Sequence, residues 1–320
     1  MNQQQDGNTP PKWERDLINR LSFAALAEQR RTRRWGIFFK FLFFSYIILI
    51  TAVAFQESEI VDVKVGDKKH TAMVEVSGVI SDSTDANADT IIEGLQDAFE
   101  DKDTQGVVLR INSPGGSPVQ SALVYDEIIR LRAIYPDIPL YAVILDVGAS
   151  GSYFIASAAD QIFVNESSIV GSIGVLMNGF GFTGAMEKLG IERRLLTAGE
   201  HKGGLDPFTP LNDADVTHIR KLLATIHSNF INAVKKGRGD RLTDHPDLFS
   251  GRFWSGQESI ELGLADKLGD VNYVAREIIE AEEVVDFTPK SDLFSRFADR
   301  IGSSISKSIG LSRSQALQIQ

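Results

Sequence analysis

One serine lies at a sharp turn between an apolar run and a helical pattern. The run Leu140–Leu145 leads into Gly148-Ala149-Ser150-Gly151, and small and aromatic residues at helical spacing follow. The flanking glycines allow a tight bend and the close approach of a substrate backbone. The hydroxyl of Ser150 could then act as a nucleophile, with the N–H of Gly151 as an oxyanion donor. The same small residues would also suit close packing of a helix on a strand, so this stretch alone leaves both interpretations open.

The residue that would activate this serine is not fixed by a local motif. Ser152 replaces the last glycine of the Gly-x-Ser-x-Gly elbow, so a base other than histidine has to be considered. Lys202 lies among small and apolar residues, where burial would favour the neutral amine that a Ser–Lys enzyme needs. A solvated loop lysine is the alternative. His201 is the rival base, and its acidic orienter could be Asp146, Asp160 or Asp206.

A pair of glycines follows another buried-type strand. Gly106–Ile111 runs directly into Asn112-Ser113-Pro114-Gly115-Gly116, and a helical pattern resumes at Val119. Adjacent glycines ahead of a helix expose backbone N–H groups without side chains in the way, as an oxyanion hole requires. A tight turn between a strand and a helix would have the same composition. The pair is therefore a candidate for the oxyanion hole and not a proof of one.

The composition of the chain excludes several classes of function. The 320 residues are 43% hydrophobic and 24% charged, which is ordinary for a globular protein with a core. A net charge of −10 disfavours a nucleic-acid partner. The absence of cysteine excludes disulfides, thiol catalysis and cysteine metal sites. The five histidines show no metal-motif spacing, so we expect neither a metal nor a cofactor.

An apolar run near the N-terminus has the length of a membrane span. Ile37–Phe55 is aliphatic and aromatic, with Lys40 as its one charge. As a helix it would extend about 28 Å, close to the roughly 30 Å of a bilayer core. Four arginines between Arg30 and Arg34 precede it and acidic residues follow, which places the N-terminus in the cytoplasm. A cleaved signal peptide is the competing interpretation, but the run starts late and lacks a clear cleavage site.

The elements that would position the candidate residues form an α/β pattern. Apolar strands at 71–80, 106–111, 140–145 and 161–164 alternate with helical segments, which favours a largely parallel sheet. Residues 213–236 form a long helix with Asn212 or Asp213 as its cap, and 271–283 a final helix. Amphipathic spacing at Trp13–Ala25 and beyond Ser291 indicates segments that could lie on a membrane or a partner, or stay disordered. The predicted organisation is a cytoplasmic segment (1–34), an anchor (35–56), a linker (57–70), a catalytic domain (71–286) and a tail (287–320).

Six motifs in order resemble one family. They are Asn112-Ser-Pro-Gly-Gly, Gly148-Ala-Ser-Gly-Ser-Tyr, Ala158-Ala-Asp, Gly171-Ser-Ile-Gly-Val, Gly199-Glu-His-Lys and Gly251-Arg-Phe-Trp-Ser-Gly. This set is similar to that of the signal peptide peptidase A family, the serine–lysine membrane proteases with a fold like that of ClpP and crotonase. The resemblance covers about Met73 to Leu268, and it implies repeated β-β-α units with a largely parallel sheet, preceded by one transmembrane helix.

The resemblance also implies roles for individual residues. Ser150 would be the nucleophile, Lys202 the general base, and Ser172 the serine that orients the lysine, while His201 becomes a bystander. Gly115 and Gly116 would form the oxyanion hole, with the N–H of Gly151 or a neighbour as the other donor. One departure is Ser152, where family members carry Gly-Gly-Tyr or similar after the nucleophile.

The sequence therefore predicts a serine endopeptidase of the bacterial inner membrane. Its catalytic domain would face the periplasm. The resemblance implies that it degrades short apolar peptides such as cleaved signal peptides, and that it forms a homo-oligomer, because relatives assemble into rings. Two other classes stay open. A crotonase-like acyl-CoA enzyme would have no reason for an anchor, and a non-catalytic membrane scaffold would not need Ser150, Lys202 and Ser172 together.

Overall fold

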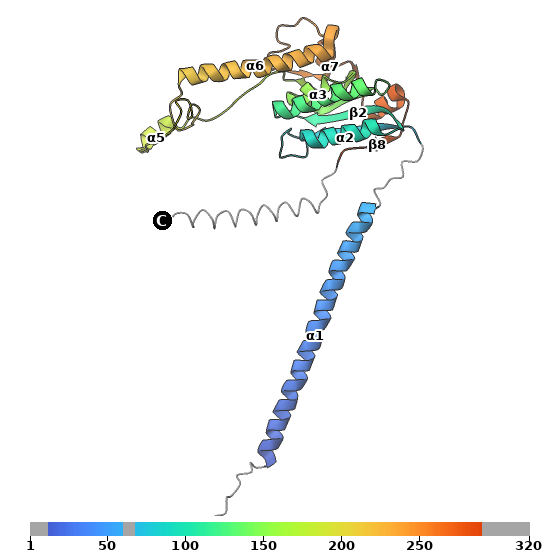
Figure 1. Ribbon diagram of the computed structural model, residues 1–320, viewed down its shortest axis with the longest axis vertical. Coiled ribbons are helices and arrows are strands. Elements are labelled where there is room, and N and C mark those ends of the chain that lie inside the picture. Colours follow the sequence, from blue (N-terminus) through green and yellow to red (C-terminus); the bar gives the residue numbers. More distant parts are fainter. Residues whose placement is uncertain (1–11, 60–67, 290–320) are drawn as a thin grey trace, which may run out of the picture. The chain divides into compact units, whose positions relative to one another are not determined.

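The computed structural model describes residues 12–59 and 68–289, which fall in two compact units, 1–66 and 67–320 (Figure 1). The first unit is one long helix, α1 (Lys12–Glu59). The amphipathic segment and the apolar run that the sequence separates are therefore parts of a single helix. No helix in the described part of the chain is both long and apolar enough to cross a membrane. The predicted anchor (35–56) includes residues 50–56, whose side chains lie outside the described part of the chain. The anchor therefore stays a prediction.

The second unit is built on a mostly parallel sheet with the strand order β6-β5-β3-β2-β1-β8. Strand β4 pairs with β3 and β7, and among the strands of residues 68–289 only β6 runs antiparallel to its neighbour. Parallel strands need crossover connections, which the helices between them provide. The strands are β1 (His70–Ser77), β2 (Thr104–Ser113), β3 (Leu140–Ala149), β4 (Gln161–Val164), β5 (Ile169–Gly171), β6 (Phe253–Ser255), β7 (Lys267–Leu268) and β8 (Val284–Asp286).

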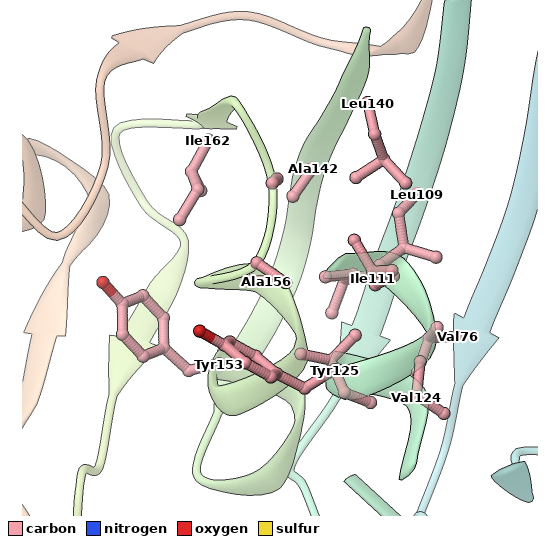
Figure 2. Packing of buried hydrophobic residues seen from close by; sticks show 14 of the residues in the cluster. Val76, Leu109, Ile111, Val124, Tyr125, Leu140, Ala142, Tyr153, Ala156 and Ile162 are labelled. Atoms are coloured by element: carbon pink, nitrogen blue, oxygen red, sulfur yellow. The ribbon is translucent and has the colours of Figure 1, made fainter. Parts of the chain in front are cut away.

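Helices α2 (Ala88–Glu100), α3 (Pro118–Ile134) and α4 (Gly151–Ala156) cover one face of this sheet (Figure 1). The first two begin where side chains satisfy free backbone N–H groups: Asn87 accepts from Thr90, and Ser117 accepts from Gln120. Between helices and sheet lies the main core, to which Leu109, Ile111, Tyr125 and Tyr153 contribute (Figure 2). Successive strand residues point to opposite faces, so Val108 belongs instead to a smaller cluster on the other face.

The remaining elements form an arm and a C-terminal cover. The arm is defined here as residues 175–222, and it holds α5 (Thr183–Leu189) and the first part of α6 (Asp213–Arg238). It lies at the far end of α6 from the sheet (Figure 1). After α6 come α7 (Gly256–Glu261), α8 (Val271–Tyr273) and a π-helical turn over Val274–Ile279. Val274, Ile278 and Ile279 pack in the cluster on the second face of the sheet.

The α/β class and the mostly parallel sheet agree with the sequence-based expectation. The predicted helix over 271–283 is wrong in its second half. The regular helix covers only three residues and widens into the π turn, and Glu280 adopts a left-handed φ of 61° that ends it. The chain then enters β8, a strand that the apolar spacing did not predict. Of the predicted linker and tail, residues 60–67 and 290–320 lie outside the described residues.

Candidate active site

Ser150 occupies a strained turn between β3 and α4. Its φ of 54° and ψ of −123° are costly for a residue with a side chain, and among the described residues only Ser172 and Glu280 share a positive φ without being glycine. Backbone bonds hold the turn in place: the Ser150 N–H donates to the carbonyl of Gly171 (2.8 Å), and its own carbonyl accepts from Phe154 (3.0 Å). The surrounding strand and helix thus impose a conformation that serine would otherwise avoid.

The two glycines after β2 press directly against this turn. A Cβ on Gly115 would lie 2.5 Å from the nitrogen of Gly151 and 2.8 Å from the Cβ of Ser150. Gly115 also has a φ of +91°, and a Cβ on Gly116 would lie 2.0 Å from the carbonyl oxygen of Ile80. Only glycine fits in either position, because the colliding atoms are mostly backbone. The segment predicted as an oxyanion hole is therefore in contact with the predicted nucleophile turn.

Two backbone N–H groups beside Ser150 are available as donors. The N–H of Gly115 is already used, since it donates to the hydroxyl of Ser113 (3.1 Å). Within residues 68–289, the N–H groups of Gly116 and Gly151 donate to no other protein group. The nitrogen of Gly116 lies only 3.2 Å from the position that a Cβ on Gly151 would take. Two unbonded donors this close to a serine suit the oxyanion of an acyl-transfer intermediate.

Ser172 lies on the segment that supports the nucleophile turn. It follows Gly171, whose carbonyl accepts from Ser150, and its own N–H donates to the carbonyl of Arg252 (2.7 Å). On the other side, the ring of Trp254 packs against Gly171, where a Cβ would lie 2.9 Å from the Trp254 Cδ1. The motif around Trp254, one of the six that carry the family resemblance, thus pairs with β5 as strand β6 and fixes the position of Ser172.

Lys202 is not brought to Ser150 of its own chain. It is exposed in the arm, where its N–H donates to the carbonyl of Gly199 (3.2 Å). The turn that carries it contacts other arm residues: a Cβ on Gly203 would touch Leu195, and one on Gly204 would touch Asp215. The burial that the sequence suggested for this lysine is therefore not present in the single chain. Figure 1 shows the arm well away from the sheet that carries Ser150.

His201 has an acidic partner that the sequence did not single out. Its Nδ1 lies 2.6 Å from Oδ1 of Asp215, at the start of α6. The three predicted orienters have other partners: Asp146 accepts from Asn112 (3.0 Å), Asp160 pairs with Arg132, and Asp206 pairs with Arg193 (2.9 Å). A backbone hydrogen bond from Phe208 and the guanidinium of Arg193 hold the pKa of Asp206 below its usual value. The pairing of His201 with Asp215 could not be predicted from the sequence, because the two residues are 14 positions apart and lie on different elements.

A buried polar cluster anchors the helix behind Ser150. The hydroxyl of Tyr153 donates to the carbonyl of Leu264 (2.8 Å), and its complete burial raises the pKa of this phenol. Nearby, Arg238 is fully buried and forms two hydrogen bonds with Asp266 (2.8 and 2.9 Å). Burial alone would raise the pKa of Asp266, but the hydrogen bonds and charge of Arg238 outweigh it and hold that pKa below its ordinary value. The Tyr153 bond ties α4 to the segment around Leu264, and the ion pair with Arg238 ties the nearby Asp266 to α6.

Comparison with known families decides the class of the domain. Residues 134–285 match the model of peptidase family S49. This stretch of the chain is therefore similar to an S49 peptidase domain. The matched region contains Ser150, Ser172 and Lys202, while Gly115 and Gly116 lie before it. The resemblance to the signal peptide peptidase A family, indicated by the six motifs, is thereby confirmed.

Individual relatives agree with this assignment over part of their length. The chain is 31% identical to Protease 4 of Haemophilus influenzae over 218 residues. The aligned region covers 67% of this chain and 34% of that protein. It is 27% identical over 216 residues to the chloroplastic serine protease SPPA of Arabidopsis thaliana, 65% of this chain and 32% of that one. It is also 47% identical over 182 residues, 57% of its length, to a protein of Brucella abortus named Na⁺/H⁺ antiporter NhaA. The chain spans only 25% of that protein, so the antiporter name says nothing about this chain.

Proposed function

We propose that the protein is a serine endopeptidase in which Ser150 attacks the carbonyl carbon of a peptide bond. The observation that carries the proposal is the strained turn of Ser150 beside the free N–H groups of Gly116 and Gly151. The Lys202 amine takes the hydroxyl proton, the two N–H groups stabilise the oxyanion, and the proton passes to the leaving amine. Water then hydrolyses the acyl-enzyme and regenerates Ser150. Ser172 hydrogen-bonds the lysine and orients it.

The active form is a homo-oligomer in which Lys202 of one copy reaches Ser150 of a neighbour. Two observations support this part of the proposal. Lys202 lies in an arm that projects from its own domain, and that arm exposes large apolar side chains: Leu176 is 78% exposed, Phe180 83% and Leu196 96%. Exposed large apolar side chains of this kind are typical of an interface between subunits. Burial in that interface would supply the desolvation that makes Lys202 a base.

The helix α1 anchors this peptidase to the inner membrane of a bacterium, with its N-terminus in the cytoplasm and the S49 domain in the periplasm. The aromatic and aliphatic side chains around Trp35–Leu49 and the arginines before them support this topology. The substrates are short apolar peptides at the membrane, such as signal peptides left after secretion. Added protease should therefore digest the domain in intact spheroplasts. Digestion only after lysis would contradict the topology.

The shared active site is tested by mixing two inactive variants. Ser150→Ala lacks the nucleophile and Lys202→Ala lacks the base, so each alone should fail to cleave a fluorogenic apolar peptide. When the two are co-assembled, some sites combine an intact Ser150 with an intact Lys202, and activity should return to roughly a quarter of the wild-type rate if subunits mix at random. No recovery in a mixed oligomer would contradict the shared site. A folded oligomer in which the wild type itself is inactive would favour the scaffold alternative.

A further inference from the structure

The pairing of β2 with β3 becomes irregular where the active site begins. The two strands are in regular parallel register up to Ile111 opposite Ile144, and the next pair is Ser113 opposite Gly148. Two extra residues therefore lie on β3 between these pairs. After this break the ladder holds the two turns through the single pair of Ser113 with Gly148. Other contacts between the two turns therefore add to their alignment.

A buried hydroxyl forms one such contact. Ser152, on the first turn of α4, is 0% exposed. Its Oγ lies 2.7 Å from the carbonyl oxygen of Ser113 and 2.9 Å from that of Ala149, so its single hydrogen is shared between one acceptor on each turn. For a buried hydroxyl, such a bond is strong and costly to leave unmade. A second link, from Asn112 to Asp146 (3.0 Å), lies at the exposed edge of the same region.

The bonded carbonyl is directly coupled to the oxyanion donors. The hydroxyl of the same Ser113 accepts from the N–H of Gly115 (3.1 Å). This bond occupies the N–H of Gly115 and leaves the N–H of Gly116, whose nitrogen lies close to Gly151, without a protein acceptor. Ser152 thus holds the residue that sets the orientation of the glycine pair.

We propose that Ser152 is a positioning residue, which aligns the N–H of Gly116 with Ser150 and the N–H of Gly151 through its bond to the Ser113 carbonyl. The inference rests on the proposed peptidase function. Family members that carry glycine at this position lack the hydroxyl. In this chain, by contrast, a side-chain contact made by Ser152 would align the oxyanion hole. The effect should appear where charge develops on the carbonyl oxygen and should leave ground-state binding of the peptide unchanged.

The test compares Ser152→Ala and Ser152→Thr with the wild type in the full-length protein. We expect Ser152→Ala to lower kcat by about ten- to a hundredfold with KM within a factor of two, because the donors are displaced and not removed. A peptide aldehyde, which forms a tetrahedral adduct, should bind weaker by a similar factor, while the matching peptide alcohol keeps its affinity. Ser152→Thr keeps the hydroxyl and should recover most of kcat. Ser259→Ala is the control, since Ser259 is an equally buried serine whose hydroxyl donates to a carbonyl, that of Gly256 (2.7 Å).

Each outcome decides the inference. Unchanged kcat and aldehyde affinity in Ser152→Ala would overturn the positioning role while leaving the peptidase proposal intact. An equal loss of kcat in Ser259→Ala, or a Ser152→Ala protein that does not fold, would show a purely structural role. A wild-type protein that neither cleaves the peptide nor binds the aldehyde would overturn the peptidase proposal and the inference together.

Discussion

Replacing Gly115 with alanine should separate catalysis from stability. The new Cβ would lie 2.5 Å from the nitrogen of Gly151, 2.6 Å from the carbonyl oxygen of Ala149 and 2.8 Å from the Cβ of Ser150. None of these atoms can rotate away, so the turn of the glycine pair has to move relative to the nucleophile. The loss of one oxyanion donor typically costs about 10²–10³ in kcat, or roughly 2.7–4 kcal/mol. We therefore expect kcat to fall at least about a hundredfold.

The left-handed backbone of Gly115 adds a cost in stability. A φ of +91° is unfavourable for alanine by about 1–2 kcal/mol, which corresponds to a fall in Tm of roughly 2–8 °C for a domain of this size. Gly239→Ala is the matched control, because Gly239 also has a positive φ (+55°) but no atom lies within 4 Å of its added Cβ. It should lose stability and keep its kcat.

The assay is steady-state cleavage of a fluorogenic apolar peptide, at a temperature where thermal unfolding curves show all three proteins folded. A Gly115→Ala protein with kcat within a few-fold of the wild type would refute the assignment of this segment to the oxyanion hole. So would an equal loss of kcat in Gly239→Ala, since strain alone would then explain the effect.

Further predictions concern the base, its orienter and the buried ion pair. Lys202→Ala should abolish turnover and His201→Ala should not. Full activity in Lys202→Ala, or loss of activity in His201→Ala, would contradict the assignment of Lys202 as the general base. Ser172→Ala should lower kcat and shift the limb of the pH profile that reports the titration of Lys202. An unchanged pH profile would contradict an orienting role for Ser172. Asp266→Asn leaves Arg238 buried without its partner and should cost about 3–5 kcal/mol in urea unfolding. Because the folded pKa of Asp266 is lowered, its stabilisation is present above the ordinary value of about 3.9 and is lost as pH falls through the folded pKa. The wild type should therefore lose more stability than the variant on acidification below about pH 4, and parallel pH curves would contradict this.

Local patterns predicted the parts of the fold that local physics controls. The long helix was expected from Asp213 with Asn212 as a possible cap, and α6 begins at Asp213 with the Asn212 side chain accepting from Ala214. The strand at 161–164 appears with the same bounds as β4. The helix expected over 271–283 failed because its apolar spacing does not reveal a π turn, which arises where Ile279 packs against Gly106 in a different element.

The candidate site also has parts that the sequence could predict and parts that it could not. The turns that carry Ser150, Gly115 and Gly116 follow neighbouring parallel strands, so their proximity could be expected from the motifs and the sheet. The position of Lys202 could not, because it depends on where the arm projects and on what covers it. The contact between Asp215 and His201 and the support that Trp254 gives to Gly171 were also missed. Each joins residues from elements whose relative placement is decided only by tertiary packing.

The central claim is that Ser150 is the nucleophile of a peptidase. It is tested most directly by peptide cleavage with the wild type beside Ser150→Ala, together with a covalent serine probe read by intact mass. Our account predicts cleavage and a single mass adduct for the wild type, and the loss of both in the variant. Cleavage or an adduct that persists in Ser150→Ala, or neither in a folded and oligomeric wild-type sample, would contradict it.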